Sequence, residues 1–129
     1  MTKPQYLIDT RIILDYLGEK LPASGMSFMD DVVNAIPNVS ILSQIELLSL
    51  NTSDEYQQVL TQFMQDAIVL DLSPNVVKNT ISLCKTHNLN LQHAIIAATA
   101  ITYDYTLIVN NEYSYIYIKG LKIVNPYQL

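Results

Sequence analysis

Cysteine and glycine are both scarce in this 129-residue chain, with one cysteine and three glycines. The single cysteine, Cys84, cannot form an internal disulfide bond, so a reducing cytoplasm is the simplest expected location. Its apolar neighbours Ile81 and Leu83 indicate that Cys84 is a small core residue rather than a nucleophile. The scarcity of glycine leaves no Gly-rich phosphate-binding loop after the first apolar segment, which argues against a flavodoxin-like nucleotide or receiver domain.

Long hydrophobic runs are also missing. The longest uncharged stretch lies between Lys85 and Asp104, and its Asn, Gln, His and Thr side chains make it too polar for a membrane span. No secretory signal is expected, because Met1–Pro4 leads directly into the first apolar segment. Half of the residues are hydrophobic and 15% are charged, which predicts one packed domain over residues 1–129.

Cations are absent from the stretch between Lys20 and Lys78. That stretch holds seven acidic residues: Asp30, Asp31, Glu46, Asp54, Glu55, Asp66 and Asp71. Such a segment repels phosphate and attracts basic partners, whereas nucleic-acid binders usually show a basic stripe. Two interpretations stay open: the acidic residues attract a basic partner, or they only keep an apolar chain soluble.

Strand-like and helix-like segments alternate along the chain, which predicts an α/β fold with a mainly parallel sheet flanked by helices. The expected strands are Tyr6–Asp9, Val39–Leu42, Ala67–Leu70, Thr106–Val109 and Leu121–Val124.

The expected helices begin at capping residues. Thr10 is expected to cap a helix that ends near Gly18, and Ser24 or Ser27 to open one that runs to Ile36. Ser43 and Glu46 have the spacing of a capping box that opens a helix through Leu50. The remaining caps are Ser53, Ser73 and Asn90, with helices to about Met64, His87 and Tyr103.

Three segments, in this order, resemble the PIN-domain family, and within it the VapC-type toxin ribonucleases. They are Asp9 at the end of the first strand, the helix that includes Leu91–Ala100, and the closing Gly120–Pro126. The resemblance covers essentially the whole chain. It implies a three-layer fold with the first of five strands at the centre of the sheet. It also implies a metal-dependent endoribonuclease of a toxin–antitoxin system, a homodimer, RNA as substrate and a basic antitoxin protein as partner.

Family members hold Mg²⁺ or Mn²⁺ with three or four carboxylates at the strand ends, and the metal activates water for phosphodiester cleavage. Asp9 and Glu46 match the first two acids and are the expected metal ligands. The third and fourth positions hold His93 and Ser114. The resemblance therefore implies Asp9, Glu46, His93 and Ser114 as catalytic positions, and Thr10, Arg11, Asn111 and Glu112 as substrate-binding positions.

The loss of two carboxylates halves the negative charge available to a divalent cation. Arg11 is expected to lower it further by pairing with Asp9, and Glu112 is a candidate substitute carboxylate. His93 lies near the positive end of its helix dipole, which favours a neutral, ligand-capable ring. Two carboxylates and one imidazole suit Mn²⁺, Zn²⁺ or Ni²⁺ better than Mg²⁺. We therefore predict weakly held metal and little or no Mg²⁺-dependent ribonuclease activity.

Each position also has a structural interpretation. Asp9 would hydrogen-bond the following helix, Glu46 would complete the capping box with Ser43, His93 would start its helix, and Ser114 would be a surface residue. The alternative function is a non-catalytic PIN scaffold that acts as a dimeric binding module for a basic antitoxin-like protein.

Six of the nine tyrosines follow residue 100. Tyr115 stands where the family commonly has a core phenylalanine, so packing is expected there. The other five are a candidate dimer surface: Tyr103, Tyr105, Tyr113, Tyr117 and Tyr127.

Overall fold

One parallel sheet of five short strands organises the chain, in the order β3-β2-β1-β4-β5. The strands are β1 (Tyr6–Ile8), β2 (Asn38–Ser40), β3 (Ile68–Leu70), β4 (Thr106–Ile108) and β5 (Lys122–Val124). The computed structural model describes residues 4–129. The expectation that no secretory signal precedes the first strand concerns residues 1–3, which lie outside this described part. The parallel sheet with β1 at its centre confirms the prediction.

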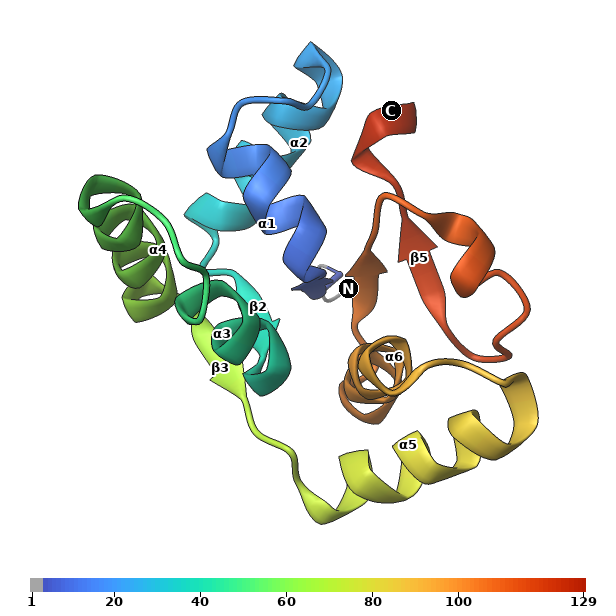
Figure 1. Ribbon diagram of the computed structural model, residues 1–129. Coiled ribbons are helices and arrows are strands. Elements are labelled where there is room, and N and C mark those ends of the chain that lie inside the picture. The colour runs from blue at the N-terminus through green and yellow to red at the C-terminus, as the bar shows by residue number, and fades with distance from the viewer. Residues whose placement is uncertain (1–3) are drawn as a thin grey trace.

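Six α-helices and two short 3₁₀ helices surround the sheet (Figure 1). They are α1 (Thr10–Leu17), α2 (Ala23–Asn34), α3 (Ile41–Leu48), α4 (Asp54–Asp66), α5 (Pro74–His87), α6 (Leu91–Tyr103), η1 (Glu112–Ser114) and η2 (Pro126–Gln128). In the described residues no helix is both long and apolar enough to cross a bilayer.

Two hydrophobic clusters, one on each face of the sheet, make the fold three-layered. Successive side chains of a strand point to opposite faces, so Leu7 belongs to one cluster and Ile8 to the other. The Leu7 side is covered by α5 and α6. The small alanine side chains of α6 let its backbone lie close to the sheet. The Ile8 side is covered by α1, α2 and α4. Because both faces are covered, the strands are largely apolar, although β2 also buries the polar side chains of Asn38 and Ser40.

Three predicted helix caps are confirmed and three are wrong. Ser53, Ser73 and Asn90 each accept a hydrogen bond from a backbone N–H of the first turn of α4, α5 and α6. By contrast, α2 starts directly after Pro22, so Ser24 and Ser27 lie inside the helix. Pro22 takes the N-cap position of α2, Ala23 is its first residue, and no side chain caps the helix.

The other two wrong caps lie at strand ends, where each strand is shorter than predicted. β1 ends at Ile8, so Asp9 takes the N-cap position of α1 and Thr10 is its first helical residue. β2 ends at Ser40, whose side chain caps α3 by accepting from the Ser43 N–H at 3.1 Å. Ser43 is thus inside α3, and the predicted capping box with Glu46 is wrong.

Candidate functional site

Asp9 lies where β1 passes into α1, at the carboxyl edge of the central strand. Its backbone N–H donates to the Ile108 carbonyl of β4 at 3.0 Å, which continues the sheet pairing by one residue. The carboxylate makes no N-cap hydrogen bond of normal geometry, although the backbone N–H groups of Thr10 and Arg11 lie near enough to lower its pKa. It lines a pocket of about 220 Å³ together with Glu46 of α3 and His93 of α6. Three residues far apart in the sequence are thus brought to one place.

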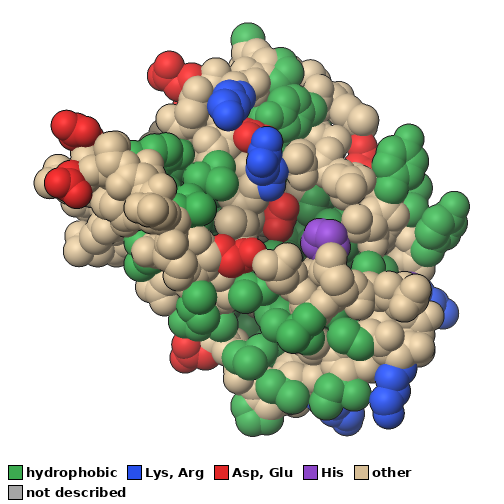
Figure 2. All heavy atoms as spheres, in the orientation of Figure 1, with side chains coloured by type: hydrophobic (Ala, Val, Ile, Leu, Met, Phe, Trp, Pro, Cys, Tyr) green, Lys and Arg blue, Asp and Glu red, His purple; other side chains and the backbone are tan. Residues whose placement is uncertain are grey.

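This pocket is visible on the face shown in Figure 2, where acidic side chains and a histidine lie close together with Lys or Arg side chains beyond them. The other lining residues are Thr10, Arg11, Leu14, Gln92 and Ile96. Five of the eight predicted site residues therefore meet here: Asp9, Thr10, Arg11, Glu46 and His93.

Burial raises the pKa of Asp9 from 3.8 to about 6. The Thr10 backbone N–H, the nearby His93 and the Arg11 backbone N–H oppose this rise, whereas the Glu46 carboxylate adds to it. A carboxyl group with such a pKa takes up a proton at mildly acidic pH. Asp9 is therefore the least well-solvated anion of the pocket.

Glu46 is held by two neutral donors from two other helices. The Thr10 hydroxyl donates to its Oε1 at 2.8 Å, and the Gln92 amide donates to its Oε2 at 2.8 Å. Thr10 Oγ1 also lies 2.8 Å from the Ser43 hydroxyl, so that α1, α3 and α6 are joined at this carboxylate. Each Glu46 oxygen thus accepts one hydrogen bond from a neighbouring helix, which fixes the orientation of the carboxylate.

His93 packs against a buried tyrosine. Its backbone N–H donates to the Asn90 side chain at 2.9 Å, and its ring meets the ring of Tyr115 edge to face at a centroid distance of 5.5 Å. Tyr115 is 3% exposed, and its hydroxyl has no hydrogen-bond partner in the described residues. Burial, together with the charges of Asp9 and Glu46, raises the pKa of Tyr115 above its ordinary value.

Tyr115 is the site residue that the sequence did not identify as such. The expected packing role is confirmed, but its hydroxyl lies close enough to the two carboxylates to feel their charge. One indication of this role was present in the sequence, because Tyr115 carries a hydroxyl at a position where the family commonly has phenylalanine.

Arg11 does not pair with Asp9 as predicted. Its Nε lies 3.3 Å from the carboxylate of Asp15, one helical turn further along α1. Asp15 is buried and also accepts a hydrogen bond from the Tyr127 hydroxyl at 2.6 Å. Arg11 is drawn away because helix geometry places residues i and i+4 on the same side.

Asn111 and Glu112 line a different hollow, of about 310 Å³, between β4, η1 and η2. Glu112 Oε1 accepts a hydrogen bond from the Asn125 amide at 3.2 Å, so its carboxylate faces η2. The Asn111 side chain lies 3.5 Å from Ser114 Oγ. Glu112 therefore does not substitute for the missing carboxylates, and Ser114 supplies no charge.

The pocket is a poor fit for Mg²⁺. Across residues 4–129 no three His, Cys, Asp or Glu side chains lie close enough together to hold one metal ion. Mg²⁺ demands near-octahedral oxygen ligands and several negative charges. The pocket supplies two carboxylates, those of Asp9 and Glu46, which is fewer than such a site needs.

Comparison with protein-family models and with curated proteins finds no match to the sequence. Comparison with solved structures finds chains of the same architecture. A chain of a toxin–antitoxin complex from Klebsiella pneumoniae has a TM-score of 0.76 and 22% identity, covering 97% of this chain and 100% of that one. For VapBC2 from Rickettsia felis, bound to a promoter DNA fragment, the TM-score is 0.77 at 18% identity, with 93% and 97% covered.

This chain has a PIN-like fold. FitAcB from Neisseria gonorrhoeae is also similar, with a TM-score of 0.73 and 20% identity over 97% of this chain and 100% of that one. At these identities the likeness concerns the fold, and it confirms the architecture expected from the sequence resemblance.

Proposed function

We propose that this chain is a PIN-domain protein of the VapC-type toxin lineage whose metal-dependent endoribonuclease activity is lost or strongly weakened. The fold, shared with chains of toxin–antitoxin structures, supports the lineage. The lining of the Asp9 pocket supports the second part, because among the described residues Asp9 and Glu46 are the two carboxylates that it brings together. His93 and Ser114 supply no negative charge in place of the two missing carboxylates.

Phosphodiester cleavage by in-line displacement requires stabilisation of the negative charge that develops on the phosphate. With two carboxylates the pocket offsets little of the cost of stripping water from Mg²⁺. Mn²⁺ tolerates imidazole and irregular geometry better, so any residual activity should depend on Mn²⁺ rather than Mg²⁺.

Restoring the carboxylates tests this proposal. The double substitution His93→Asp with Ser114→Asp should produce Mg²⁺-dependent cleavage of a mixed RNA substrate that the parent lacks, and growth inhibition on expression. The gain should exceed about tenfold in initial rate, because removing one transition-state contact commonly costs that much or more. The measurement is fluorescence release from a quenched RNA, with Mg²⁺ and Mn²⁺ compared.

The matched control adds Asp9→Asn to the double variant. Cleavage that survives in this triple variant would come from a contaminating nuclease. A parent that already cleaves RNA with Mg²⁺ as fast as the double variant would refute the weakened-site proposal.

Partner binding is the alternative function, and the acidic stretch between Lys20 and Lys78 favours it together with the toxin–antitoxin structures of like fold. A non-catalytic scaffold would still form a stable complex with a small basic antitoxin-like protein. Co-expression with the product of an adjacent open reading frame, followed by size-exclusion chromatography, should yield such a complex from the parent chain. A parent that elutes alone, with the basic protein in a separate peak, would contradict this alternative.

A further inference from the structure

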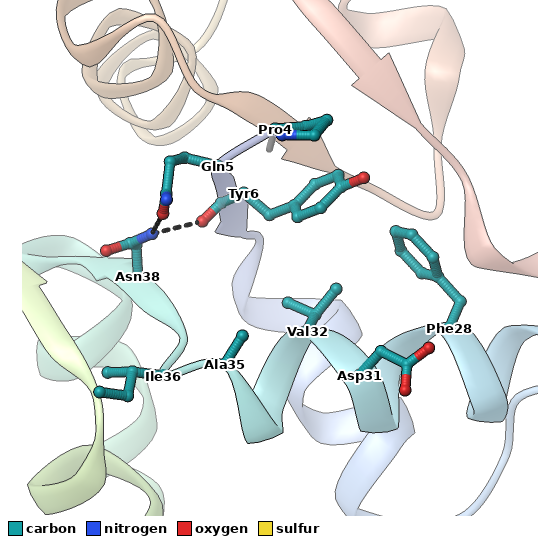
Figure 3. Close-up of a pocket in the computed structure, with 9 residues that line it drawn as sticks. All are labelled: Pro4, Gln5, Tyr6, Phe28, Asp31, Val32, Ala35, Ile36 and Asn38. Atoms are coloured by element: carbon teal, nitrogen blue, oxygen red, sulfur yellow. Dashed lines mark hydrogen bonds between the residues drawn. The ribbon is translucent and has the colours of Figure 1, made fainter. Parts of the chain in front are cut away.

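A second hollow lies at the opposite edge of the sheet from Asp9. Gln5 and Tyr6, at the start of β1, and Asn38, at the start of β2, line a cavity of about 360 Å³ against the second half of α2 (Figure 3). Because β1 and β2 are parallel, this hollow is at their amino ends, whereas the Asp9 pocket is at the carboxyl end of β1. The two sites are therefore separate.

Its walls are mostly apolar and partly aromatic. The rings of Tyr6 and Phe28 meet edge to face, with centroids 5.3 Å apart and planes at 85°. Figure 3 shows Phe28, Asp31 and Val32 along α2, with Tyr6 across the hollow from them. Ile36 lies beyond the end of this helix. Such a hollow offers an apolar slot with a carboxylate at its mouth.

The amide nitrogen of Asn38 is already hydrogen-bonded, but the carboxylate of Asp31 is not. Asn38 Nδ2 donates to the Tyr6 carbonyl at 2.9 Å and to Gln5 Oε1 at 3.5 Å. Within residues 4–129 the exposed Asp31 carboxylate has neither an ion pair nor a hydrogen bond. None of the residues that line the hollow within residues 4–129 is a lysine or an arginine, so the lining supplies Asp31 with no positive charge.

Ile36 lies at the rim of the hollow in a strained conformation. Its φ is +67°, a left-handed value that β-branched side chains rarely adopt, and Pro37 follows it. The side chain is 57% exposed, so burial of Ile36 does not account for the strain. Backbone strain of this kind clusters at ligand-binding sites.

We propose that this hollow binds an arginine side chain of a basic protein partner. The methylene stem would lie along Val32 and Ile36, and the planar guanidinium would stack on the aromatic pair and pair with the Asp31 carboxylate. The half-open shape and the exposed rim suit a side chain presented by another protein. This inference does not depend on whether the Asp9 pocket cleaves RNA.

The test uses the full chain, labelled with ¹⁵N, and three capped tripeptides with arginine, its neutral analogue citrulline or glutamate between two glycines. The arginine peptide should shift the backbone amide signals of Tyr6, Phe28 and Ile36 with a Kd on the order of 1 mM. The citrulline peptide, which keeps the shape and loses the charge, should bind about tenfold more weakly, and the glutamate peptide should not bind.

Two variants localise the effect. Asp31→Asn should weaken binding of the arginine peptide about tenfold, whereas Asp71→Asn, which removes an equal charge from an exposed position outside the hollow, should leave it unchanged. Equal binding of arginine and citrulline, equal losses in the two variants, signal changes confined to the Asp9 pocket, or no binding up to about 10 mM would each overturn the proposal.

Discussion

At the scale of single residues, Asp9 shows how a strand end creates an unusual carboxyl group. Its backbone is fixed by the β4 pairing, and its side chain is left between the central strand and three helices, where little water reaches it. Burial then raises its pKa to about 6. The same residue type at the exposed Asp71 has no such surroundings.

The raised pKa of Asp9 makes stability depend on pH. The folded state holds the Asp9 proton more tightly than the unfolded state, so this contribution is complete below pH 3.8 and is lost as the pH rises through about 6. Asp9→Asn removes the buried charge and should raise the free energy of unfolding at neutral pH by about 1–3 kcal/mol. Urea unfolding of both proteins across this range measures the effect.

Below pH 3.8 the Asp9→Asn variant and the parent should have nearly equal stability, since Asp9 is then protonated in both states. Asp71→Asn serves as the control for the loss of one negative charge. A parent that is as stable as Asp9→Asn at every pH would show that Asp9 is better solvated than the structure indicates.

Tyr115 offers a second prediction at this scale. Its buried hydroxyl has no partner in the described residues, and an unsatisfied buried polar group costs about 1–3 kcal/mol. Tyr115→Phe should therefore raise the free energy of unfolding by about 1 kcal/mol while keeping the ring against His93. Chemical denaturation measures this, with Tyr113→Phe as the control because Tyr113 is 87% exposed. A loss of stability would indicate that the Tyr115 hydroxyl has a bound water or ligand as partner.

At the scale of elements, the carboxyl-terminal segment is fastened onto α1 and α2. The Tyr127 hydroxyl donates to Asp15 of α1, and the Ser24 hydroxyl of α2 donates to the Leu129 carbonyl. Gly25 makes the approach possible, because a Cβ at this position would lie 2.2 Å from the Pro126 carbonyl oxygen. η2 thus closes the helical layer formed by α1 and α2.

Gly25→Ala tests this docking. In a helix exposed to solvent the change should stabilise by up to about 1 kcal/mol, but here the methyl group meets backbone. We expect a loss of about 1–3 kcal/mol, or displacement of η2 with faster proteolysis at the carboxyl terminus. Gly18→Ala is the control, since its φ of −85° suits alanine and its nearest contact is 3.1 Å. Equal stability of Gly25→Ala and the parent would mean that η2 does not dock on α2.

At the scale of the whole molecule, most exposed aliphatic side chains lie outside the tyrosine-rich carboxyl-terminal region. Tyr113 and Tyr117 are exposed, as the sequence suggested. More apolar side chains are exposed on α3, beside β3 and on α5 and α6: Ile45, Leu48, Leu50, Ile68, Leu72, Val77, Ile81 and Leu91. Hydrophobic side chains gather over the lower part of the molecule in Figure 2, where Figure 1 places α5. Large exposed apolar patches mark association surfaces.

We expect the chain to form a homodimer through this aliphatic surface. Ile81→Glu should shift the species to monomer with little effect on folding, because Ile81 is already 52% exposed. Size-exclusion chromatography with light scattering, over a range of concentrations, measures the change. If Tyr113→Ser with Tyr117→Ser dissociates the dimer instead, the tyrosine-rich end is the interface. A parent that is monomeric throughout would contradict dimerisation.

The sequence by itself determined the order of strands and helices along the chain and three of the helix caps. These features depend on local patterns, namely apolar runs, turn residues and Ser or Asn before a helix. The resemblance carried by Asp9, Leu91–Ala100 and Gly120–Pro126 then selected the arrangement of the sheet that the structure confirms.

Only the tertiary structure decided what the polar side chains do. Ser43 and Glu46 have the spacing of a capping box, yet Thr10 and Gln92 bind Glu46 from other helices. Arg11 is adjacent to Asp9 along the chain, yet pairs with Asp15. The physical reason is that a hydrogen bond or ion pair depends on distances of a few ångströms between separate elements, which local sequence patterns do not contain.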